Sequence, residues 1–278
     1  MKCKIFIGFL LLVTVTGYAT LIAQEDMVDR VSVKLSDPSK PCFIECGLVN
    51  GGITVIGYDG QEVIVEATTH TKKYSKNDEN DKTKGMFRIP VNSTSLEVEE
   101  HHNRIDISTA SWKRTTDVSV KVPKQTSLNL SCVNKGDIYV ENVSGELEVN
   151  NVNGAVTLKD VGGSVVAHAL NKKLEVNLLE ITPDKPMSFS TMNGDVDVTF
   201  PATLKANVKI KADQGDVYSD FEIQKLDKSR QVIEENGRDE EGKYRISIEN
   251  AFYGTINGGG PEFQFTSWQG DILIRKAN

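Results

Sequence analysis

The chain has little of several residue types that mark common protein classes. Its 278 residues include 8 prolines, 4 histidines, 4 cysteines and only 7% aromatic side chains. Basic residues are outnumbered, with 32 Lys and Arg against 39 Asp and Glu, which gives a net charge of −7. This balance argues against a nucleic-acid-binding protein, because such binding depends on clustered Lys and Arg. The 22 glycines and 38% hydrophobic residues are instead typical of a turn-rich β protein with an apolar core.

Residues 1–23 have the features of a cleaved secretory signal. Lys2 and Lys4 form a basic start, residues 5–15 are an apolar run, and Leu21-Ile22-Ala23 precedes the expected cleavage site. Thr and Gly interrupt the segment before it reaches the roughly 20 apolar residues of a membrane span. We therefore expect export to the periplasm, the outer-membrane surface or the extracellular space, with no transmembrane segment after signal removal.

Three cysteines follow this segment, Cys42, Cys46 and Cys132, and an odd number is no disulfide framework. In an extended strand, Cys42 and Cys46 would lie about 13 Å apart, whereas a disulfide needs Cα atoms within about 7 Å. A turn at Glu45 would bring them together, and a Cys46–Cys132 bridge is a second alternative. The expectation is that all three are buried free thiols.

A nine-residue unit repeats between Gly136 and Leu170, in the form Gly-x-apolar-x-apolar-x-x-apolar-x. The alternation predicts a short strand with one buried face, and the glycine marks a corner. The apolar residues that we expect to point inward fall into three registers: Ile138, Leu147, Val156, Val165; Val140, Val149, Leu158, Ala167; and Val143, Val152, Val161, Leu170.

A longer spacing follows, in which Gly154, Lys172, Gly194 and Gly215 open similar segments 18, 22 and 21 residues apart. Two strands in each such span are typical of one coil of a parallel β-helix, although nine-residue spacing also suits an antiparallel meander. A side-chain amide before each corner favours the helix, because amides stacked about 4.8 Å apart can form a hydrogen-bonded ladder. The amides are Asn153, Asn171, Asn193, Gln214 and Gln269.

These patterns predict an all-β fold, a single-chain parallel β-helix (β-solenoid) with two main strands per 18–22-residue coil. Residues 24–125 are expected to form an irregular β-rich N-terminal cap with the first coils, and residues 126–278 the regular solenoid. Residues 72–85 are polar and predict a loop. A second loop excursion is expected at residues 225–243, with room for a helical turn around Val232 and Ile233.

From about Val118 to Lys276 the chain resembles the putative-adhesin, β-strand-repeat domains of bacterial envelope proteins. The resemblance is carried by the strings VPKQTSLNLSCVNKGDIYVENVSGELEV, PMSFSTMNGDVDVTFPATLKANVKIKADQGDVYSDFE and GGGPEFQFTSWQGDILIRK. It implies an exported parallel β-helix without cofactor, and the family has no catalytic motif to carry over.

Stacked acids are the one pattern that points toward catalysis. Asp195 and Asp216 each follow a corner glycine and are expected one coil apart, while Asp197 shares the outward face with Asp195. Carboxylates about 5 Å apart can share a proton or a calcium ion. Because Gly-Asp is also ordinary corner chemistry and no basic partner is expected nearby, we interpret them as solvated surface acids.

The remaining chemistry-bearing residues give no site. His101 and His102 would point to opposite faces of a strand, and His70 and His168 are isolated, so no metal site is expected. No catalytic or nucleotide-binding fingerprint occurs in a usable context. The outward tyrosines, Tyr139 and Tyr218, are too few for a sugar-binding row. Trp112 and Trp268 are expected to cap ends or pack under loops rather than to serve as exposed anchors.

The sequence therefore predicts a protein with no catalytic, cofactor-binding or metal site. The expected role is that of a non-enzymatic, adhesin-like or scaffold protein of the bacterial cell envelope, whose partner is a cell-surface polysaccharide or an envelope protein. The alternative is a carbohydrate-active β-helix enzyme that acts on acidic polysaccharide through its Asp rows.

Overall fold

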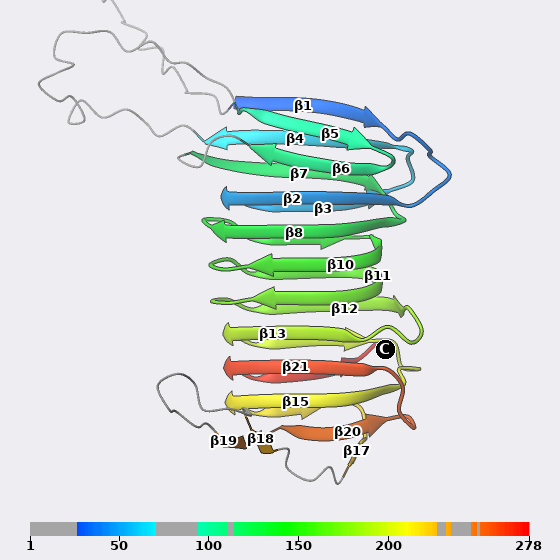
Figure 1. Cartoon of the computed structure of the whole chain (residues 1–278), viewed down its shortest axis with the longest axis vertical. Coiled ribbons are helices and arrows are strands. Elements are labelled where there is room, and N and C mark those ends of the chain that lie inside the picture. Colours follow the sequence, from blue (N-terminus) through cyan, green and yellow to red (C-terminus); the bar gives the residue numbers. More distant parts are fainter. Residues whose placement is uncertain are drawn as a thin grey trace, which may run out of the picture.

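The computed structural model of the chain describes residues 27–70, 94–109, 114–226 and 251–277, together with the backbone of residues 232–234 and 246–248. Within these ranges the chain forms 22 β-strands and no helix. Two rows of strands are stacked one level above another along the longest axis (Figure 1). The protein is thus all-β, with parallel and antiparallel strand pairs.

We call the first row ladder A. Its neighbouring strands are paired in parallel, and their side chains alternate between the interior and the surface. In stacking order the strands are β6 (Arg104–Thr109), β2 (Cys42–Asn50), β8 (Thr126–Asn134), β10 (Ser144–Asn151), the second half of β11 (Val156–Ala169), β13 (Met187–Asn193), β21 (Glu262–Gln269) and β15 (Ala206–Gln214).

The second row, ladder B, is also parallel and lies behind ladder A in the view of Figure 1. In stacking order its strands are β7 (Thr115–Pro123), β3 (Ile53–Tyr58), β9 (Ile138–Glu141), the first half of β11, β12 (Leu174–Ile181), β14 (Val196–Phe200), β22 (Ile272–Lys276) and β16 (Val217–Ser219). Each level therefore contains one strand of each ladder, joined by a corner.

Antiparallel strands cover most of the stack ends. At one end β5 (Leu96–His101) pairs with β6, and β4 (Glu62–His70) pairs with both β7 and β1 (Met27–Lys34). At the other end β20 (Phe252–Ile256) pairs with β15 and with β17 (Ile223–Lys225). The helical turn expected near Val232 is wrong, because β18 (Val232–Glu234) forms an antiparallel pair with β19 (Ile246–Ile248).

The order of levels in the stack departs from the order of the sequence at two places. The β2–β3 level lies between the levels of β6–β7 and β8–β9, and the β21–β22 level lies between those of β13–β14 and β15–β16. The 21-residue spacing predicted that the segments opened by Gly194 and Gly215 lie on neighbouring levels. This prediction is wrong, because the β21–β22 level lies between them. Levels of equal length give equal spacing whether or not they touch, so the spacing cannot reveal an inserted level.

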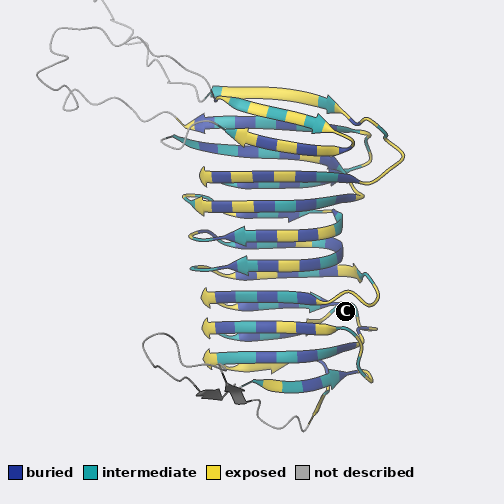
Figure 2. Cartoon of the chain, in the orientation of Figure 1, coloured by how far each residue is buried: buried dark blue, intermediate teal, exposed yellow. Residues whose placement is uncertain are grey.

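The interior between the two ladders is filled by the inward side chains of both, and buried positions alternate with exposed ones along most strands (Figure 2). Two of the three predicted registers are confirmed, because all eight of their residues are buried. In the third register Val143 and Val161 are buried, but Val152 and Leu170 are partly exposed. The preceding residues, Asn151 and Ala169, occupy the interior at that corner and turn their successors outward.

An aromatic cluster fills the interior where β21 is inserted. Phe189, Phe200, Phe263 and Phe265 are all at most 1% exposed. The rings of Phe189 and Phe265 are stacked with centroids 5.3 Å apart, and Phe200 meets Phe265 edge to face at 6.1 Å. Two of the four rings come from β21, so the inserted strand is a large part of the core at this end.

The three described cysteines are buried free thiols, as expected. Cys42 and Cys46 lie on the same strand, β2, with both side chains inward and no turn at Glu45. Burial raises the pKa of Cys42 to about 11 and that of Cys46 to about 12. The thiols therefore stay protonated at neutral pH and act as small apolar core residues.

Candidate functional site

The aspartates suggested for catalysis belong to a column at the corner that leads into ladder B. Asp195 and Asp216 are not on adjacent levels, because Asp271 of the inserted β21–β22 segment lies between them. Asp195 Oδ1 accepts the backbone N–H of Asp271 at 2.9 Å, and Asp271 Oδ1 accepts that of Asp216 at 2.9 Å. The carboxylates of Asp195 and Asp271 thus each accept a backbone N–H of the next level.

The same hydrogen bond recurs in the first half of the stack. Asp117 Oδ1 accepts the N–H of Gly52 at 2.7 Å, and Asp137 Oδ1 accepts that of Ala155 at 2.8 Å. Every one of these bonds runs toward the β16 end of the stack. The corner aspartates therefore satisfy backbone groups that the strand ladders leave unpaired, which is a structural role.

Asp197 has basic partners, contrary to the sequence-based expectation. Arg275 donates to its carboxylate through Nε at 2.7 Å and through a second guanidinium nitrogen at 3.3 Å. Lys173 Nζ lies 3.5 Å from the same carboxylate. The hydrogen bond and charge of Asp197 raise the pKa of Arg275. Asp197 is thus neutralised by two cations from other levels.

The histidines lie in three separate places. His101 ends β5 and His102 has a φ of +53° in the following turn. This turn brings their Nδ1 atoms to 3.0 Å instead of sending the rings to opposite faces. His70 pairs with Asp117 at 2.7 Å, and His168 Nδ1 is 2.7 Å from Ser190 Oγ. No cluster of three or more metal-ligating side chains occurs among the described residues.

The two tyrosines that the sequence singled out, Tyr139 and Tyr218, share one outward column of ladder B. Tyr139 lies on β9 and Tyr218 on β16, and the positions between them are Thr157, Glu175, Asp197 and Leu273. The hydroxyl of Tyr139 donates to Glu141 at 2.9 Å. Tyr218 is 54% exposed. Trp268 on β21 is also exposed, at 47%, and does not pack under a loop of the described chain, whereas Trp112 lies outside the described residues.

An open groove lies beside Tyr218, where β16 forms the last strand of ladder B. It is lined by β16 and β22, through Val217, Tyr218, Ser219, Asp220, Leu273, Ile274 and Arg275. The negative charges of Asp216 and then Asp271 raise the pKa of Tyr218. The groove therefore offers an exposed aromatic ring, the Asp220 carboxylate and the Arg275 guanidinium on or beside two neighbouring strands, a mixture suited to a hydroxyl-rich ligand.

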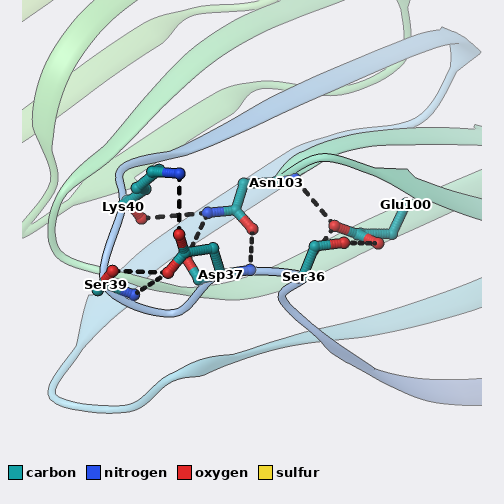
Figure 3. Close-up of polar contacts among 6 residues, drawn as sticks. All are labelled: Ser36, Asp37, Ser39, Lys40, Glu100 and Asn103. Atoms are coloured by element: carbon teal, nitrogen blue, oxygen red, sulfur yellow. Dashed lines mark hydrogen bonds and ion pairs between the residues drawn. The ribbon is translucent and has the colours of Figure 1, made fainter.

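A second polar cluster, at the opposite end of the stack, has a structural role, because it joins two loops by hydrogen bonds (Figure 3). Asn103 is buried and has a φ of +64°. Its side chain donates to the carbonyl of Asp37 at 2.6 Å and accepts the Asp37 N–H at 2.8 Å. Hydrogen bonds from Ser39, with Lys40 3.0 Å away, lower the pKa of Asp37 to about 2. The cluster holds the loop after β1 against the β5–β6 turn.

The predicted amide ladder is confirmed along the corner that follows ladder A. Asn153 donates to Asn134 Oδ1 at 2.8 Å, Asn171 to Asn153 at 2.9 Å, and Asn193 to Asn171 at 2.8 Å. Farther along, Gln269 donates to Gln214 at 3.3 Å. The column extends farther than predicted, since Asn134 belongs to it and Asn50 holds the same register position on the adjacent level. Gln269 precedes Gln214 because its level is inserted.

We expect Asn171→Ala and Asn193→Ala to be non-additive. Each removes a member of the hydrogen bond between them, and groups in direct contact show coupling energies of about 0.5 kcal/mol or more. Asn193→Ala should cost about 1 kcal/mol, the net value of its one ladder bond, and Asn171→Ala about 2 kcal/mol, because Asn171 makes two. Urea unfolding of both single variants and the double variant measures the coupling. Strict additivity would contradict the stacked amide ladder.

Sequence reasoning missed a set of buried polar side chains at the same corner, Asn151, Thr191 and Ser267. Asn151 Oδ1 accepts the N–H of Gly154 at 2.9 Å, and its Nδ2 donates to the carbonyls of Gly136 and Ala155. Thr191 and Ser267 donate to the carbonyls of Lys172 and Gly194. Each lies two residues before a ladder amide, at a position whose side chain points inward. A polar residue at that position was the signal in the sequence that could have predicted these hydrogen bonds.

The chain is similar in structure to proteins described as putative adhesins. One is a putative cell adhesion protein from Clostridium sporogenes, with 10% identity and a TM-score of 0.47 over 91% of this chain and 100% of the other. Another is a putative adhesin from Bacteroides fragilis, with 13% identity and a TM-score of 0.32 over 92% and 98%. No family model matches the sequence, and no curated protein matches it. No described segment is a helix long and apolar enough to span a membrane.

Proposed function

We propose that the protein is an exported, non-enzymatic, adhesin-like scaffold of the bacterial cell envelope that binds a surface polysaccharide. Its body is a β-solenoid in which each level contributes one strand to each ladder. Residues 24–125 supply the cap and first levels, and residues 126–278 the regular array. Export rests on the basic start and apolar run of residues 1–23, which is removed as a signal peptide.

The groove beside Tyr218 is the observation that carries the proposal. Its exposed ring can stack on the apolar face of a sugar. The Asp220 oxygen that does not accept the Lys276 N–H can accept from a sugar hydroxyl, and the terminal guanidinium nitrogen of Arg275 that does not donate to Asp197 can donate to one. Two of the three aspartates of the enzymatic alternative are already engaged, since Asp195 accepts a backbone N–H and Asp197 is ion-paired with Arg275. A rigid stack that presents a binding groove at one end suits adhesion.

Binding to a panel of bacterial capsular and cell-wall polysaccharides tests this proposal. We expect Tyr218→Ala to weaken binding about tenfold or more, equivalent to the loss of ~1.4 kcal/mol. Tyr139→Ala is the matched control, because Tyr139 occupies the same column of ladder B at a distant level. Equal affinity of the two variants, or no binding to any polysaccharide, would overturn the proposed function.

Export has its own test. N-terminal sequencing of the protein recovered from its native cells should give a chain beginning at Gln24, and protease treatment of intact cells should degrade it if it faces the medium. A chain that retains residues 1–23 in the cytoplasm would contradict export while leaving the groove intact.

A further inference from the structure

An apolar stripe runs along the surface beside the amide ladder, with one residue on each of six successive levels. Its members, in stacking order, are Val49, Val133, Val152, Leu170, Met192 and Trp268. They lie at the carboxyl ends of the ladder A strands, which form one edge of the stack (Figure 1). Val49, Val133, Met192 and Trp268 are 40–49% exposed, and Val152 and Leu170 are partly exposed. At about 4.8 Å per level the stripe is about 24 Å long.

The two columns that flank the stripe carry no fixed charge, and apart from Gly47 their side chains are polar. On one side are the ladder amides and, on the other, the outward positions two residues earlier in each strand: Gly47, Ser131, Asn150, His168, Ser190 and Thr266. Asp213 on β15 ends the stripe beyond Trp268. A band three columns wide that carries no Lys, Arg, Asp or Glu is unusual in a chain with 26% charged residues. Contiguous exposed apolar surface rimmed by polar groups marks an interaction site.

We propose that this stripe is the interface of a two-fold symmetric homodimer. The stripe has one side chain per level, so the stripe of a second copy has the same spacing. The two sets of side chains therefore stay in phase over all six residues. A bound extended peptide would present side chains on one face only every ~6.6 Å, so it would fall out of phase. Without Lys2 and Lys4 of the signal, each copy carries 30 basic and 39 acidic residues, a net charge of −9, and two such copies repel each other least where both surfaces are uncharged.

The sizes of the six side chains fix the orientation of the two copies. Along the stack the stripe passes from three valines to Leu170, Met192 and Trp268, so it widens toward one end. When the two-fold axis is perpendicular to the stripe, residue i contacts j while j contacts i, and the stripes run antiparallel. Val49 then faces Trp268, Val133 faces Met192, and Val152 faces Leu170. Each contact combines a small side chain with a larger one, and the gap between the copies stays even.

Sedimentation velocity of the purified protein over a concentration series tests the dimer. We expect a concentration-dependent dimer in the wild type. Met192→Glu and Val133→Lys should each weaken it about 30-fold or more, the loss expected for a central interface residue. Leu179→Glu is the control, because Leu179 is 63% exposed on ladder B, away from the stripe. This variant should dimerise as the wild type does.

Mixing the two charged variants tests the antiparallel arrangement. In the mixed dimer Lys at position 133 of one copy faces Glu at position 192 of the other, while the second contact keeps its native Val and Met. We expect the 1:1 mixture of Val133→Lys and Met192→Glu proteins to recover dimer that neither forms alone. In a parallel pair position 133 faces its own equivalent, so the mixture would relieve like-charge repulsion but bring no Lys and Glu together, and its dimer would stay weaker than that of the wild type.

Several outcomes would overturn the inference. They are a wild type that stays monomeric at all concentrations, charged variants that dimerise normally, and a mixture that shows no recovery although both variants give native circular dichroism and unfolding curves. The dimer does not rest on the proposed polysaccharide binding, because the groove and the stripe lie on different ladders. Loss of either property leaves the other measurable.

Discussion

Phe265→Ala is expected to lower the free energy of unfolding by about 3–5 kcal/mol, the range for deletion of a buried aromatic ring. Phe265 is 1% exposed and contacts both Phe189 and Phe200 through ring faces and edges. The rings come from three strands of both ladders, so the cavity left by the substitution cannot close without moving strands. Urea unfolding followed by circular dichroism measures the loss.

Phe252→Ala provides the control for this prediction. Phe252 lies on β20 at the end of the stack and is 39% exposed. Its removal should cost clearly less, because less apolar area leaves the interior. If Phe265→Ala cost less than about 1 kcal/mol, β21 would not be an interior level, and the insertion of β21–β22 between β13–β14 and β15–β16 would be contradicted.

The local pattern of the fold was predictable because neighbouring residues determine it. Alternation placed Ile138 and Val140, and their equivalents on three further strands, in the core, and the structure buries all of them. The amides before each corner predicted a hydrogen-bonded column, and bonds between Asn153, Asn171 and Asn193 confirm it. These features depend only on strand pleat and on equal spacing between levels.

The order of the levels was not predictable in this way. Segments 42–58 and 262–276 enter the stack between levels that are adjacent in sequence, and the pairing depends on contacts between residues more than 50 positions apart. Phe263 and Phe265 alternate with polar residues, so the sequence indicates a strand there but not which strands it pairs with. Periodicity reports the length of each level, whereas the choice of neighbour is made by packing.

The same long-range pairing changed the interpretation of the acidic residues. Asp271 lies between Asp195 and Asp216 and is hydrogen-bonded to the first through its backbone and to the second through its side chain. Asp197 binds Arg275, which lies 78 positions later in the chain. The groove at Tyr218 also needs β22 as its second wall. Sequence alone had isolated Tyr218 as one of two scattered tyrosines, since it could not show that Asp216, Asp271 and Arg275 lie around it.

Leu158→Ala, at an inward position of ladder B, is expected to lower the free energy of unfolding by about 2–5 kcal/mol. Leu158 is fully buried on β11, and its neighbours in the column are Val140 on β9 and Val176 on β12. Because the levels above and below are held by backbone hydrogen bonds, they cannot collapse into the space that the leucine leaves. Chemical denaturation of the variant measures the cost.

Thr157→Ala is the matched control, one residue away on the same strand. Thr157 points outward between Tyr139 and Glu175, and the change should stay within about 0.5 kcal/mol, as for other surface substitutions. The ratio of the two effects measures the register directly, since a shift of one residue would exchange them. Similar losses in both variants would mean that β11 has no distinct inner and outer face, and the two-ladder interior would then be wrong at its centre.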